Sequence, residues 1–570
     1  MQNFLKSQFL RRGRDLVFDY RVVLCLITVY FILVFNWKVL GHFYAILGGL
    51  EAFDPVFAAS APFVLFFGLM AIFPIFSFRP FFKPFFVFLI LTSAVVSFAM
   101  THYGIVFDRS MITNFAETNP SEAASYLNVR SVLLFAVTGM LPVGILAFMP
   151  VRYAPSFLRG LGQKMLIVVI SLSCLGGIGF GYFKDYASVG RNNKILGKEV
   201  VPVNYIAASI QYAKHRLRAT QIPFRTIGND ARMTPTTGKP TLMFLVVGET
   251  ARAASVAANG YDRPTSEFTG KIPDLVAFQN VTSCGTATAV SVPCMFSPMT
   301  HSTYNEGIAD NSENLLDVLA KAGVDVFWNE NDGGCKGVCD RIANRTISDK
   351  EFPGMCAGGL CFDETMIDAV GQELGAETGA ETGDEKGDVG KDRLIVLHLN
   401  GSHGPTYYER YPDNFRHFMP DCQQSDIENC TQQELVNTYD NTIRYTDFVI
   451  ARLVDALKEQ SEHYNTALLY VSDHGESLGE SGLYLHGAPY FLAPAEQTHV
   501  PMMFWMSSGL AQDQKIDRGC LDGLARTGAF SHDNLFSTTL GLMQVETSIY
   551  DRTSDILAAC VQKGDRYARR

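Results

Sequence analysis

The first third of the sequence is poor in charged side chains, and this scarcity excludes an ordinary water-soluble domain for that part of the chain. Residues 1–183 are instead rich in Phe, Leu and Val, whereas the later residues have the mixed composition of a globular domain. The mean composition conceals this division because it averages two different parts. We therefore expect a membrane region followed by a water-exposed region.

Five stretches of the first region are apolar over the roughly 20 residues that a helix needs to cross a bilayer. They lie at about 22–44, 57–78, 81–106, 131–150 and 164–183. Core helices of a soluble protein are the alternative, but five such runs in succession are difficult to bury without a bilayer. Pro74, Pro80 and Pro84 predict kinks or breaks near the second and third stretches.

The N-terminus lacks a small-residue cleavage site, and its apolar run is too long for a cleavable secretory signal. The loop that contains Glu51 and Asp54 has no Lys or Arg, whereas the N-terminal segment and two later loops are basic. The basic positions are Lys6, Arg11, Arg12, Arg14, Arg21, Arg79, Lys83, Arg152, Arg159 and Lys164. This pattern predicts a cytoplasmic N-terminus, and five crossings then place residues after about 184 on the opposite side.

No Cys-x-x-Cys spacing occurs among the cysteines of the water-exposed part, while Cys25 and Cys174 lie in predicted spans. Cysteines that come in close pairs are typical of an oxidising compartment such as the periplasm. A zinc site made of thiolates is the alternative, although the spacing does not favour it. We predict the disulfides Cys284–Cys294, Cys335–Cys339, Cys356–Cys361, Cys422–Cys430 and Cys520–Cys560.

The water-exposed part is expected to begin with a bridging segment at 184–238. Within it, "YIAASIQYAKHRLR" is amphipathic and basic, so it either lies along an anionic membrane surface or forms a solvated connecting helix. Residues 239–570 alternate apolar runs with helical patterns, which predicts an α/β domain with a mainly parallel sheet. The expected strands are "TLMFLVVGE", "VDVFWNE", "RLIVLHLNGSH", "TALLYVSDHGE" and "PMMFWM". The acidic, Gly-rich repeat at 371–392 predicts a surface loop.

Three of these expected strands end in side chains that bind metals. Glu249 ends one strand, Asp473 and His474 end another, and His403 follows a third. Because ligands bind beyond the carboxyl ends of parallel strands, we expect these side chains to meet. Carboxylates combined with imidazoles suit zinc, and His486 is a further candidate. A single Asp-His pair is more often a capping feature, so the prediction depends on the whole set.

The segment "SCGTATAVSVPC", residues 283–294, is rich in hydroxyl side chains but has no base beside them. A metal would remove this difficulty, because zinc makes a bound alcohol more acidic, as it does bound water. If a helix begins within the segment, its first N–H groups would also face an incoming phosphate. An activated hydroxyl next to a phosphate cradle indicates phosphoryl transfer.

Several of these motifs together resemble the phosphoethanolamine transferases. They are, in order, "GETARAASVAANGYDRPT", "SCGTATAVSVPCMFS", "GSHGP", "SDHGES" and "LHGAP". These are inner-membrane enzymes of Gram-negative bacteria that modify lipid A or other lipopolysaccharide sugars, and the mobile colistin-resistance enzymes are among them. The resemblance covers nearly the whole chain and implies five spans followed by a periplasmic domain of the alkaline phosphatase and sulfatase superfamily. The repeat at 371–392 is not typical of the family.

The resemblance also implies a role for each matching residue. Thr288 would be the nucleophile and would share a primary zinc site with Glu249, Asp473 and His474. His403 and His486 would bind substrate or a second zinc, and Lys336 would contact the donor phosphate. The segment "NFAETNPSE" would bind the donor through Asn114, Thr118 and Glu122, unless it is an ordinary solvated loop helix.

The implied reaction moves phosphoethanolamine from phosphatidylethanolamine through Thr288 to a phosphate of lipid A, releasing diacylglycerol, with His403 or His486 as the acid. The product would weaken the anionic surface that binds polymyxins. We expect a monomer that binds no nucleic acid.

Alternatives to this reaction are transfer to a core sugar (Kdo or heptose), glycerol-phosphate transfer, or a non-enzymatic sensor. The complete set of metal and nucleophile positions disfavours the sensor. Neither Cys284 nor Cys294 begins the Cys-x-Pro-x-Arg site that a sulfatase requires.

Overall fold

The computed structural model describes residues 17–49, 53–118, 120–193, 195–234, 238–357, 360–377 and 390–561. The chain divides into two compact units, Met1–Asp108 with Asn128–Ile210, and Arg109–Leu127 with Gln211–Arg570. The expected boundaries at 183 and 238 therefore stay predictions. Lys6, Arg11, Arg12, Arg14, Glu51 and most of the repeat at 371–392 lie outside the described residues.

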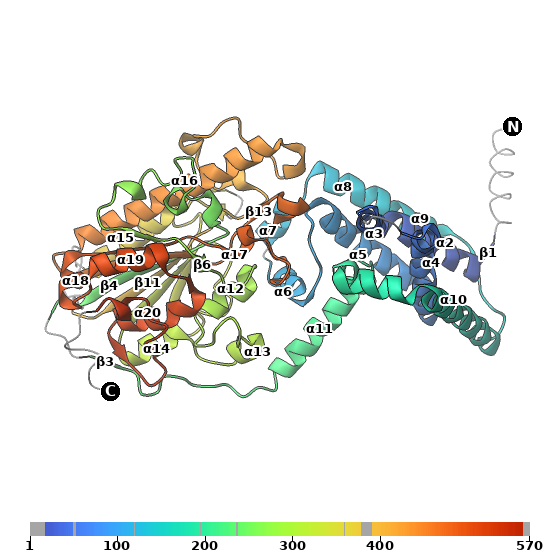
Figure 1. Cartoon of the computed structure of the whole chain (residues 1–570), viewed down its shortest axis with the longest axis horizontal. Helices are drawn as coiled ribbons and strands as arrows, with labels where there is room; N and C mark the ends of the chain where they lie inside the picture. The colour runs from blue at the N-terminus through green and yellow to red at the C-terminus, as the bar shows by residue number, and fades with distance from the viewer. Residues whose placement is uncertain are drawn as a thin grey trace. The chain divides into compact units, whose positions relative to one another are not determined.

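The first unit is helical (Figure 1). Four of its helical segments, namely Pro55–Phe76, Phe82–His102, Val129–Phe148 and Phe157–Arg191, are long and apolar enough to cross a membrane. The segments Tyr20–Phe35 and Trp37–Gly48 meet at 60° and make a fifth span if they count as one. The apolar runs predict five crossings, and the described helices provide four, or five if the bent pair is one span.

The bend in the first span is located at Asn36, which is fully buried. The side-chain amide of Asn36 donates to the carbonyl oxygens of Phe31 (3.0 Å) and Val201 (2.7 Å), and its oxygen accepts from the Val201 N–H (3.0 Å). These bonds satisfy polar groups that a break in an apolar helix would otherwise leave unpaired. The bend between η1 (Phe31–Phe35) and α3 (Trp37–Gly48) is therefore supported by specific contacts.

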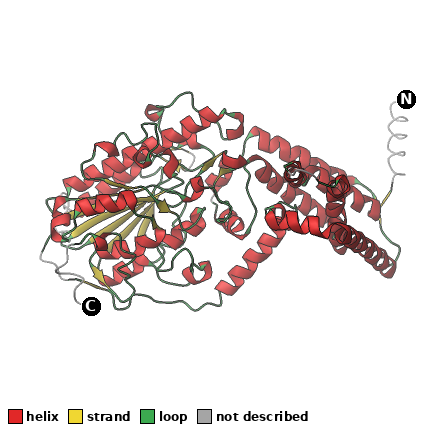
Figure 2. Cartoon of the chain, viewed as in Figure 1, coloured by secondary structure: helices red, strands yellow, loops and turns green. Residues whose placement is uncertain are grey.

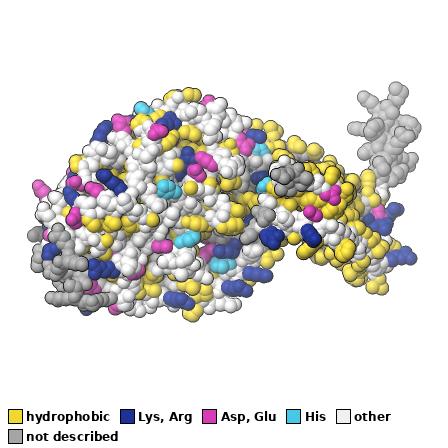
Figure 3. Space-filling model, viewed as in Figure 1, with side chains coloured by type: hydrophobic (Ala, Val, Ile, Leu, Met, Phe, Trp, Pro, Cys, Tyr) yellow, Lys and Arg dark blue, Asp and Glu magenta, His cyan; other side chains and the backbone are white. Residues whose placement is uncertain are grey.

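The surface of this unit is largely apolar, as the space-filling view shows (Figure 3). Phe148 in α9 (Leu141–Phe148) and Phe180 in α10 (Phe157–Asn192) are 89% and 94% exposed. Water would oppose so large an apolar surface, whereas lipid tails accept it. The exposed side chains thus support the membrane region predicted from composition.

The second unit is built around a seven-stranded sheet in the order β5-β15-β12-β4-β11-β7-β8 (Figure 2). The five expected strands are β4 (Thr241–Gly248), β7 (Asp325–Glu330), β11 (Arg393–His398), β12 (Asn465–Ser472) and β15 (Met502–Met506). The strands β12, β4, β11, β7 and β8 (Ala343–Thr346) are parallel, whereas β15 runs antiparallel to β12. The mainly parallel α/β prediction is confirmed, and the short strands β5 (Val276–Phe278) and β8 were not predicted.

Helices cover both faces of this sheet (Figure 1). On one face lie α15 (Thr365–Glu377) and α16 (Gln432–Glu459), and on the other lie α14 (Leu315–Ala322) and α20 (Leu535–Leu542). The amphipathic segment of the bridging region forms α11 (Val203–Ala219). All five predicted disulfides are present, and Cys25 and Cys174 are not disulfide-bonded.

Candidate active site

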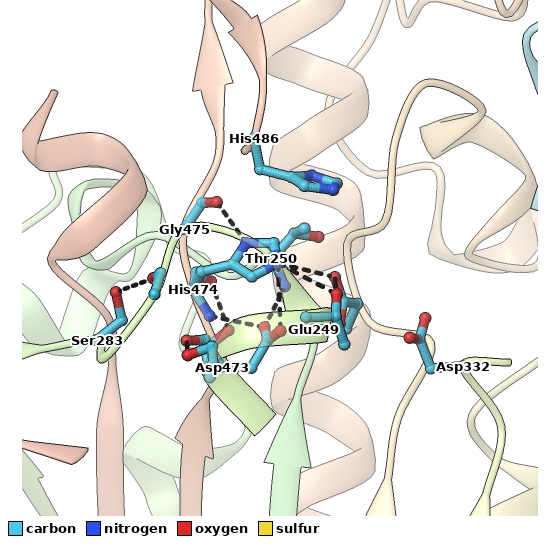
Figure 4. A network of polar contacts seen from close by, with 12 residues as sticks. Glu249, Thr250, Ser283, Asp332, Asp473, His474, Gly475 and His486 are labelled. Atoms are coloured by element: carbon cyan, nitrogen blue, oxygen red, sulfur yellow. Dashed lines mark hydrogen bonds and ion pairs between the residues drawn. The ribbon is translucent and has the colours of Figure 1, made fainter. Parts of the chain in front are cut away.

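Polar side chains from two neighbouring strands and one helix meet at the carboxyl edge of the sheet (Figure 4). Glu249 directly follows β4, and Asp473 and His474 directly follow β12, whose residue Ser472 is paired with Gly248. Thr288 is the first residue of α12 (Thr288–Met295). The three ligand candidates are fully buried and Thr288 is 4% exposed. The parallel register therefore brings together residues that lie more than 200 positions apart.

The Thr288 hydroxyl lies among these side chains. Its Oγ1 is 3.2 Å from Glu249 Oε2 and 3.3 Å from His474 Nε2. His474 Nε2 is in turn 3.2 Å from Asp473 Oδ2. Glu249, Asp473 and His474 each offer a ligand atom, and these atoms lie within 4.8 Å of one another. The predicted primary site is thus assembled as a compact group.

The electrostatics of this group suit a divalent cation. Burial raises the pKa of Glu249 well above its usual range, and the nearby carboxylates of Asp332 and Asp473 raise it further. Burial lowers the pKa of His474 to about 4, so its imidazole is neutral, and its Nδ1 contacts the Gly475 carbonyl oxygen at 3.0 Å.

The Nε2 lone pair of His474 therefore faces the carboxylates, while Asp473 Oδ2 accepts no hydrogen bond from any described residue. A cation would relieve the repulsion between the buried carboxylates and satisfy this oxygen. Two carboxylates, one imidazole and a hydroxyl are ligands that zinc accepts, so these residues fit the metal.

Thr288 differs from the other hydroxyl residues of its segment. The hydroxyl groups of Thr282, Ser283, Thr286 and Ser291 all donate to backbone carbonyl oxygens. Only the Thr288 hydroxyl, among those of residues 282–291, contacts the acidic group. The helix that the sequence predicts in this segment begins at Thr288, so the first unpaired N–H groups of α12 lie beside its hydroxyl.

His532 supports the Thr288 segment and was not found from the sequence. Its Nδ1 accepts from the Cys284 N–H (3.1 Å), and its Nε2 is 2.9 Å from the Ser472 carbonyl oxygen. The ring therefore connects the segment that contains Thr288 to the end of β12. His532 lies in the turn "SHDN", which follows no long apolar run, so no sequence pattern pointed to it.

A second group of potential ligands shares Glu249 with the first. Ligand atoms of Glu249, Asp332 and His403 lie within 4.8 Å of one another. Asp332 was not predicted from the sequence, although it follows β7 by two residues. It too lies beyond the carboxyl end of a parallel strand, where ligands bind. A third group, Cys335, Cys339 and Asp340, is not a metal site of this kind because its two cysteines form a disulfide.

The two histidines suggested for substrate binding are His403, which belongs to the second ligand group, and His486, which lies near it. The ring centres of His403 and His486 are 5.3 Å apart, and those of His474 and His486 are 4.5 Å apart. His486 Nδ1 is 2.9 Å from Glu476 Oε2. Burial lowers the pKa of His403 well below its usual value, with nearby cationic groups contributing.

Of the remaining predicted positions, Lys336 lines a cavity of about 640 Å³, together with Glu117, whereas Asn114 and Thr118 are not among its lining residues. Asn114 lies in α6 (Arg109–Glu117), and the Thr118 N–H donates to its carbonyl oxygen at 2.9 Å. A Cβ placed on Gly487 would lie 3.3 Å from Met111 Sδ, so α6 lies against the loop of His486. Glu122 belongs to α7 (Pro120–Ser125), but its side chain lies outside the described residues.

A buried ion pair lies directly under the second group. His398 Nδ1 is 2.9 Å from Glu330 Oε2, and both side chains are almost fully buried. Burial opposes the charged imidazole, but the carboxylate of Glu330 outweighs it and raises the pKa of His398 to about 9. Burial likewise opposes the carboxylate, yet His398 lowers the pKa of Glu330 to about 2. Glu330 also accepts the N–H of Asp332 at 2.7 Å, so the pair helps to position that residue.

Two family models and several relatives match this chain. The sulfatase family model matches residues 241–545, and the model of phosphoethanolamine transferase EptA/EptB matches residues 65–217. Phosphoethanolamine transferase EptA of Salmonella typhimurium is 42% identical over 474 residues, covering 83% of this chain and 84% of the relative. Phosphatidylethanolamine transferase Mcr-1 of Escherichia coli is 35% identical over 487 residues, covering 84% and 87%.

A solved structure matches almost the entire chain. It is the integral membrane protein lipooligosaccharide phosphoethanolamine transferase A (EptA) from Neisseria meningitidis, with a TM-score of 0.91 and 36% identity. The match covers 96% of this chain and 100% of the neighbour. The N-terminal helical region is therefore membrane-embedded and the C-terminal domain is soluble. The chain belongs to the phosphoethanolamine transferase family and is a transferase enzyme.

Proposed function

We propose that this enzyme transfers phosphoethanolamine from phosphatidylethanolamine to a phosphate of lipid A, with Thr288 as the nucleophile. The observation that carries the proposal is the position of the Thr288 hydroxyl, 3.2 Å from Glu249 and 3.3 Å from His474 at the start of a helix. The names of the relatives EptA and Mcr-1 support phosphoethanolamine as the transferred group. Kdo(2)-lipid A phosphoethanolamine 7''-transferase of Escherichia coli matches only 55% of this chain at 30% identity, which disfavours Kdo relative to a phosphate of lipid A.

Glu249, Asp473, His474 and Thr288 would hold a zinc ion. When bound, zinc would increase the acidity of the Thr288 hydroxyl and neutralise charge on the phosphate. The residues themselves exclude water, since the three ligand candidates are fully buried. Glu249 and Asp332 lie close enough to His403 to bind a second cation.

The chemistry then takes two displacement steps at phosphorus. In the first, Thr288 Oγ1 bonds to the donor phosphorus and the bond to the diacylglycerol oxygen breaks, with that oxygen taking a proton. In the second, a phosphate oxygen of lipid A bonds to the same phosphorus and the bond to Thr288 Oγ1 breaks. The overall reaction yields diacylglycerol and modified lipid A, and the enzyme is regenerated.

His486 is better placed than His403 to donate the proton to the leaving oxygen. His486 Nδ1 is 2.9 Å from Glu476 Oε2, and this carboxylate would orient the ring for proton transfer. Burial lowers the pKa of His403, so its neutral imidazole is better suited to ligation. Lys336, Asn114, Thr118 and Glu122 would bind the donor headgroup.

The positive-inside pattern supports a cytoplasmic N-terminus and a periplasmic catalytic domain in the inner membrane of a bacterium. The five disulfides of the second unit fit that compartment. We propose that the enzyme acts as a monomer and that its product raises polymyxin tolerance by lowering the negative surface charge.

Mass spectrometry of the full-length enzyme, incubated with phosphatidylethanolamine but without acceptor, tests the proposal. The peptide 283–294 should gain one phosphoethanolamine group, and Thr288→Ala should abolish both this adduct and turnover. Thr282→Ala is the matched control, because its hydroxyl donates to a backbone carbonyl oxygen outside the acidic group. Full activity of Thr288→Ala would refute the mechanism. Unmodified lipid A with modified core sugar in expressing cells would refute only the acceptor.

A further inference from the structure

A cavity of about 720 Å³ lies within the helical unit, and none of its lining residues belongs to the candidate active site. Its walls come from the start of α2 (Tyr20–Tyr30), the connection 77–81 before α5 (Phe82–His102), and residues 151–164 that lead into α10. Because successive spans run in opposite directions, these three segments belong to the same end of the unit. This is the end that the positive-inside pattern assigns to the cytoplasm.

The cavity is cationic. Arg79, Arg152 and Lys164 line it, and the described lining residues contain no Asp or Glu. Lys and Arg side chains gather at this end of the otherwise apolar surface (Figure 3). Three cations without a lining carboxylate create a local potential that attracts anions.

Lys164 is the central observation, because its side chain is only 7% exposed. Its Nζ lies 3.3 Å from the centre of the Phe78 ring, a cation–π contact. No described residue provides a carboxylate or a hydrogen-bond acceptor for this ammonium group. Burying a charge without a counter-charge is costly, so an anion in the cavity would stabilise the arrangement.

The carboxylate of Asp19, the residue before Tyr20, is bonded to Arg21. Asp19 is paired with Arg152 in the small sheet of β1 (Phe18–Asp19) and β2 (Val151–Arg152). Both of its carboxylate oxygens bond to the Arg21 guanidinium, at 2.9 and 3.1 Å. Asp19 acts electrostatically on Arg152, but its carboxylate is bonded to Arg21 and not to Lys164, and it is not among the residues that line the cavity.

The other walls favour an amphiphile over a simple ion. Phe78 stacks on Phe157 (5.9 Å) and Tyr20 stacks on Tyr153 (6.1 Å), which places aromatic rings around the cations. Phe81 and Phe157 line the cavity while remaining 66% and 67% exposed, so they can contact acyl chains. The 36-residue helix α10 also begins here, capped by Ser156, and its N-terminus attracts negative charge.

We propose that this cavity binds the phosphate of an anionic phospholipid from the leaflet at this end of the bundle. Phosphatidylglycerol and cardiolipin have the required chemistry, a phosphodiester of net negative charge joined to acyl chains. Lys164 would contact the phosphate from within, and Arg79 and Arg152 would contact it from the rim. The bound lipid would connect α2, α5 and α10 at a site independent of the donor and acceptor sites, and the proposal does not depend on the assigned reaction.

Lipid binding to the purified, delipidated full-length enzyme in detergent tests this proposal. Native mass spectrometry would be used to titrate dioleoylphosphatidylglycerol, dioleoylphosphatidylethanolamine and inorganic phosphate. We expect phosphatidylglycerol to bind, and Lys164→Met to weaken that binding roughly fivefold or more, the effect typical of one cation beside an anionic lipid. Arg79→Gln should also weaken the binding of phosphatidylglycerol. This second variant tests the site even if Lys164→Met fails to fold.

Arg159→Gln is the matched control, because Arg159 lies in the same first turns of α10 but does not line the cavity. Its affinity for phosphatidylglycerol should equal that of the wild type. Equal loss in Arg159→Gln would show general surface attraction and overturn the site. Unchanged binding in both cavity variants would also overturn it. Inorganic phosphate competing at equal concentration would identify a soluble anion and overturn the lipid assignment. Binding of phosphatidylethanolamine should not respond to Lys164→Met.

Discussion

Helix α10 in the membrane unit and helix α16 in the catalytic unit are both long, but they distribute their apolar side chains in opposite ways. Over its most apolar window, α10 has only 6% of its residues buried. In α16 the apolar residues Leu435, Tyr439, Ile443 and Leu453 are all buried against the rest of the domain. The difference shows that the surrounding solvent decides where an apolar side chain lies: α10 faces lipid, and α16 faces its own sheet on one side and water on the other.

The two units also treat buried charge differently. In the catalytic unit, carboxylates and imidazoles from separate strands are concentrated around the Thr288 hydroxyl, where a metal can neutralise them. In the membrane unit, the buried Lys164 ammonium contacts an aromatic ring and, by our proposal, a lipid phosphate. Each unit therefore implies a bound partner of opposite charge.

The largest expected effect is a loss of transfer activity in the catalytic unit, with both units still folded. Asp473→Asn removes a buried carboxylate of the ligand group, so transfer activity should fall on the order of 10⁴-fold, as for residues that act as one catalytic unit. Zinc content, measured by inductively coupled plasma mass spectrometry, should fall with it. Asp455→Asn, on the exposed side of α16, should retain both. A fully active, zinc-loaded Asp473→Asn enzyme would contradict the assignment.

The next effect concerns the ion pair under the catalytic edge. His398→Gln leaves Glu330 buried without its partner, so the free energy of unfolding of the catalytic unit should fall by about 3–5 kcal/mol. His463→Gln, an exposed histidine after α16, should change stability little. Chemical denaturation followed by circular dichroism measures both, and equal stability of the two variants would show that the pair contributes nothing.

The His398–Glu330 ion pair also predicts that the free energy of unfolding depends on pH. The folded pKa of His398, about 9, lies above its ordinary value of 6.5. The contribution of protonated His398 to the free energy of unfolding is therefore complete below about pH 6.5, and it is lost as the pH rises through 9. The wild type should thus lose stability relative to His398→Gln between these values, and a constant difference would contradict the assigned charge state.

The disulfides of the catalytic unit allow stability and activity to be separated. Cys520–Cys560 closes a loop of 40 residues, so replacing both cysteines by Ala should destabilise the domain by about 4 kcal/mol. Cys335–Cys339 closes only 4, which corresponds to about 2 kcal/mol. The shorter disulfide holds the loop of Lys336. Removing Cys335–Cys339 should therefore raise the KM for the donor more than removing Cys520–Cys560 does. The prediction is wrong if the two variants lose activity in the same proportion as stability.

A last pair of substitutions compares a lipid-facing position with a water-facing one. Leu172 in α10 and Met419 in the catalytic unit are both 55% exposed. Leu172→Arg should impair membrane insertion by about 3 kcal/mol, the cost of Arg within a span, whereas Met419→Arg should change stability by less than about 0.5 kcal/mol. Membrane-fraction yield and thermal unfolding measure the pair. Equal effects would show that α10 does not face lipid.

Much of the candidate site could be predicted because its residues follow recognisable strands. Glu249 and Asp473 stand at the ends of apolar runs, and the resemblance of the surrounding motifs identified Thr288 among several hydroxyls. Asp332 had a weaker signal, because Asn329, Glu330 and Asn331 separate it from the apolar run of β7. His532 had no comparable signal, since a histidine in a turn acquires its role from contacts with distant segments.

Local composition and spacing were sufficient to predict the solvent of each region, five strands of the sheet and the bonding of neighbouring cysteines. Cys520–Cys560 was predicted only because these two cysteines had no close neighbour. The folded chain was needed to show which carboxylates face one another, and that among residues 282–291 the Thr288 hydroxyl is the one in contact with Glu249. It also decided that Lys164 is buried beside a ring with no described carboxylate near it. Such properties depend on distances between segments far apart in the chain, and hydrophobic periodicity contains no information about those distances.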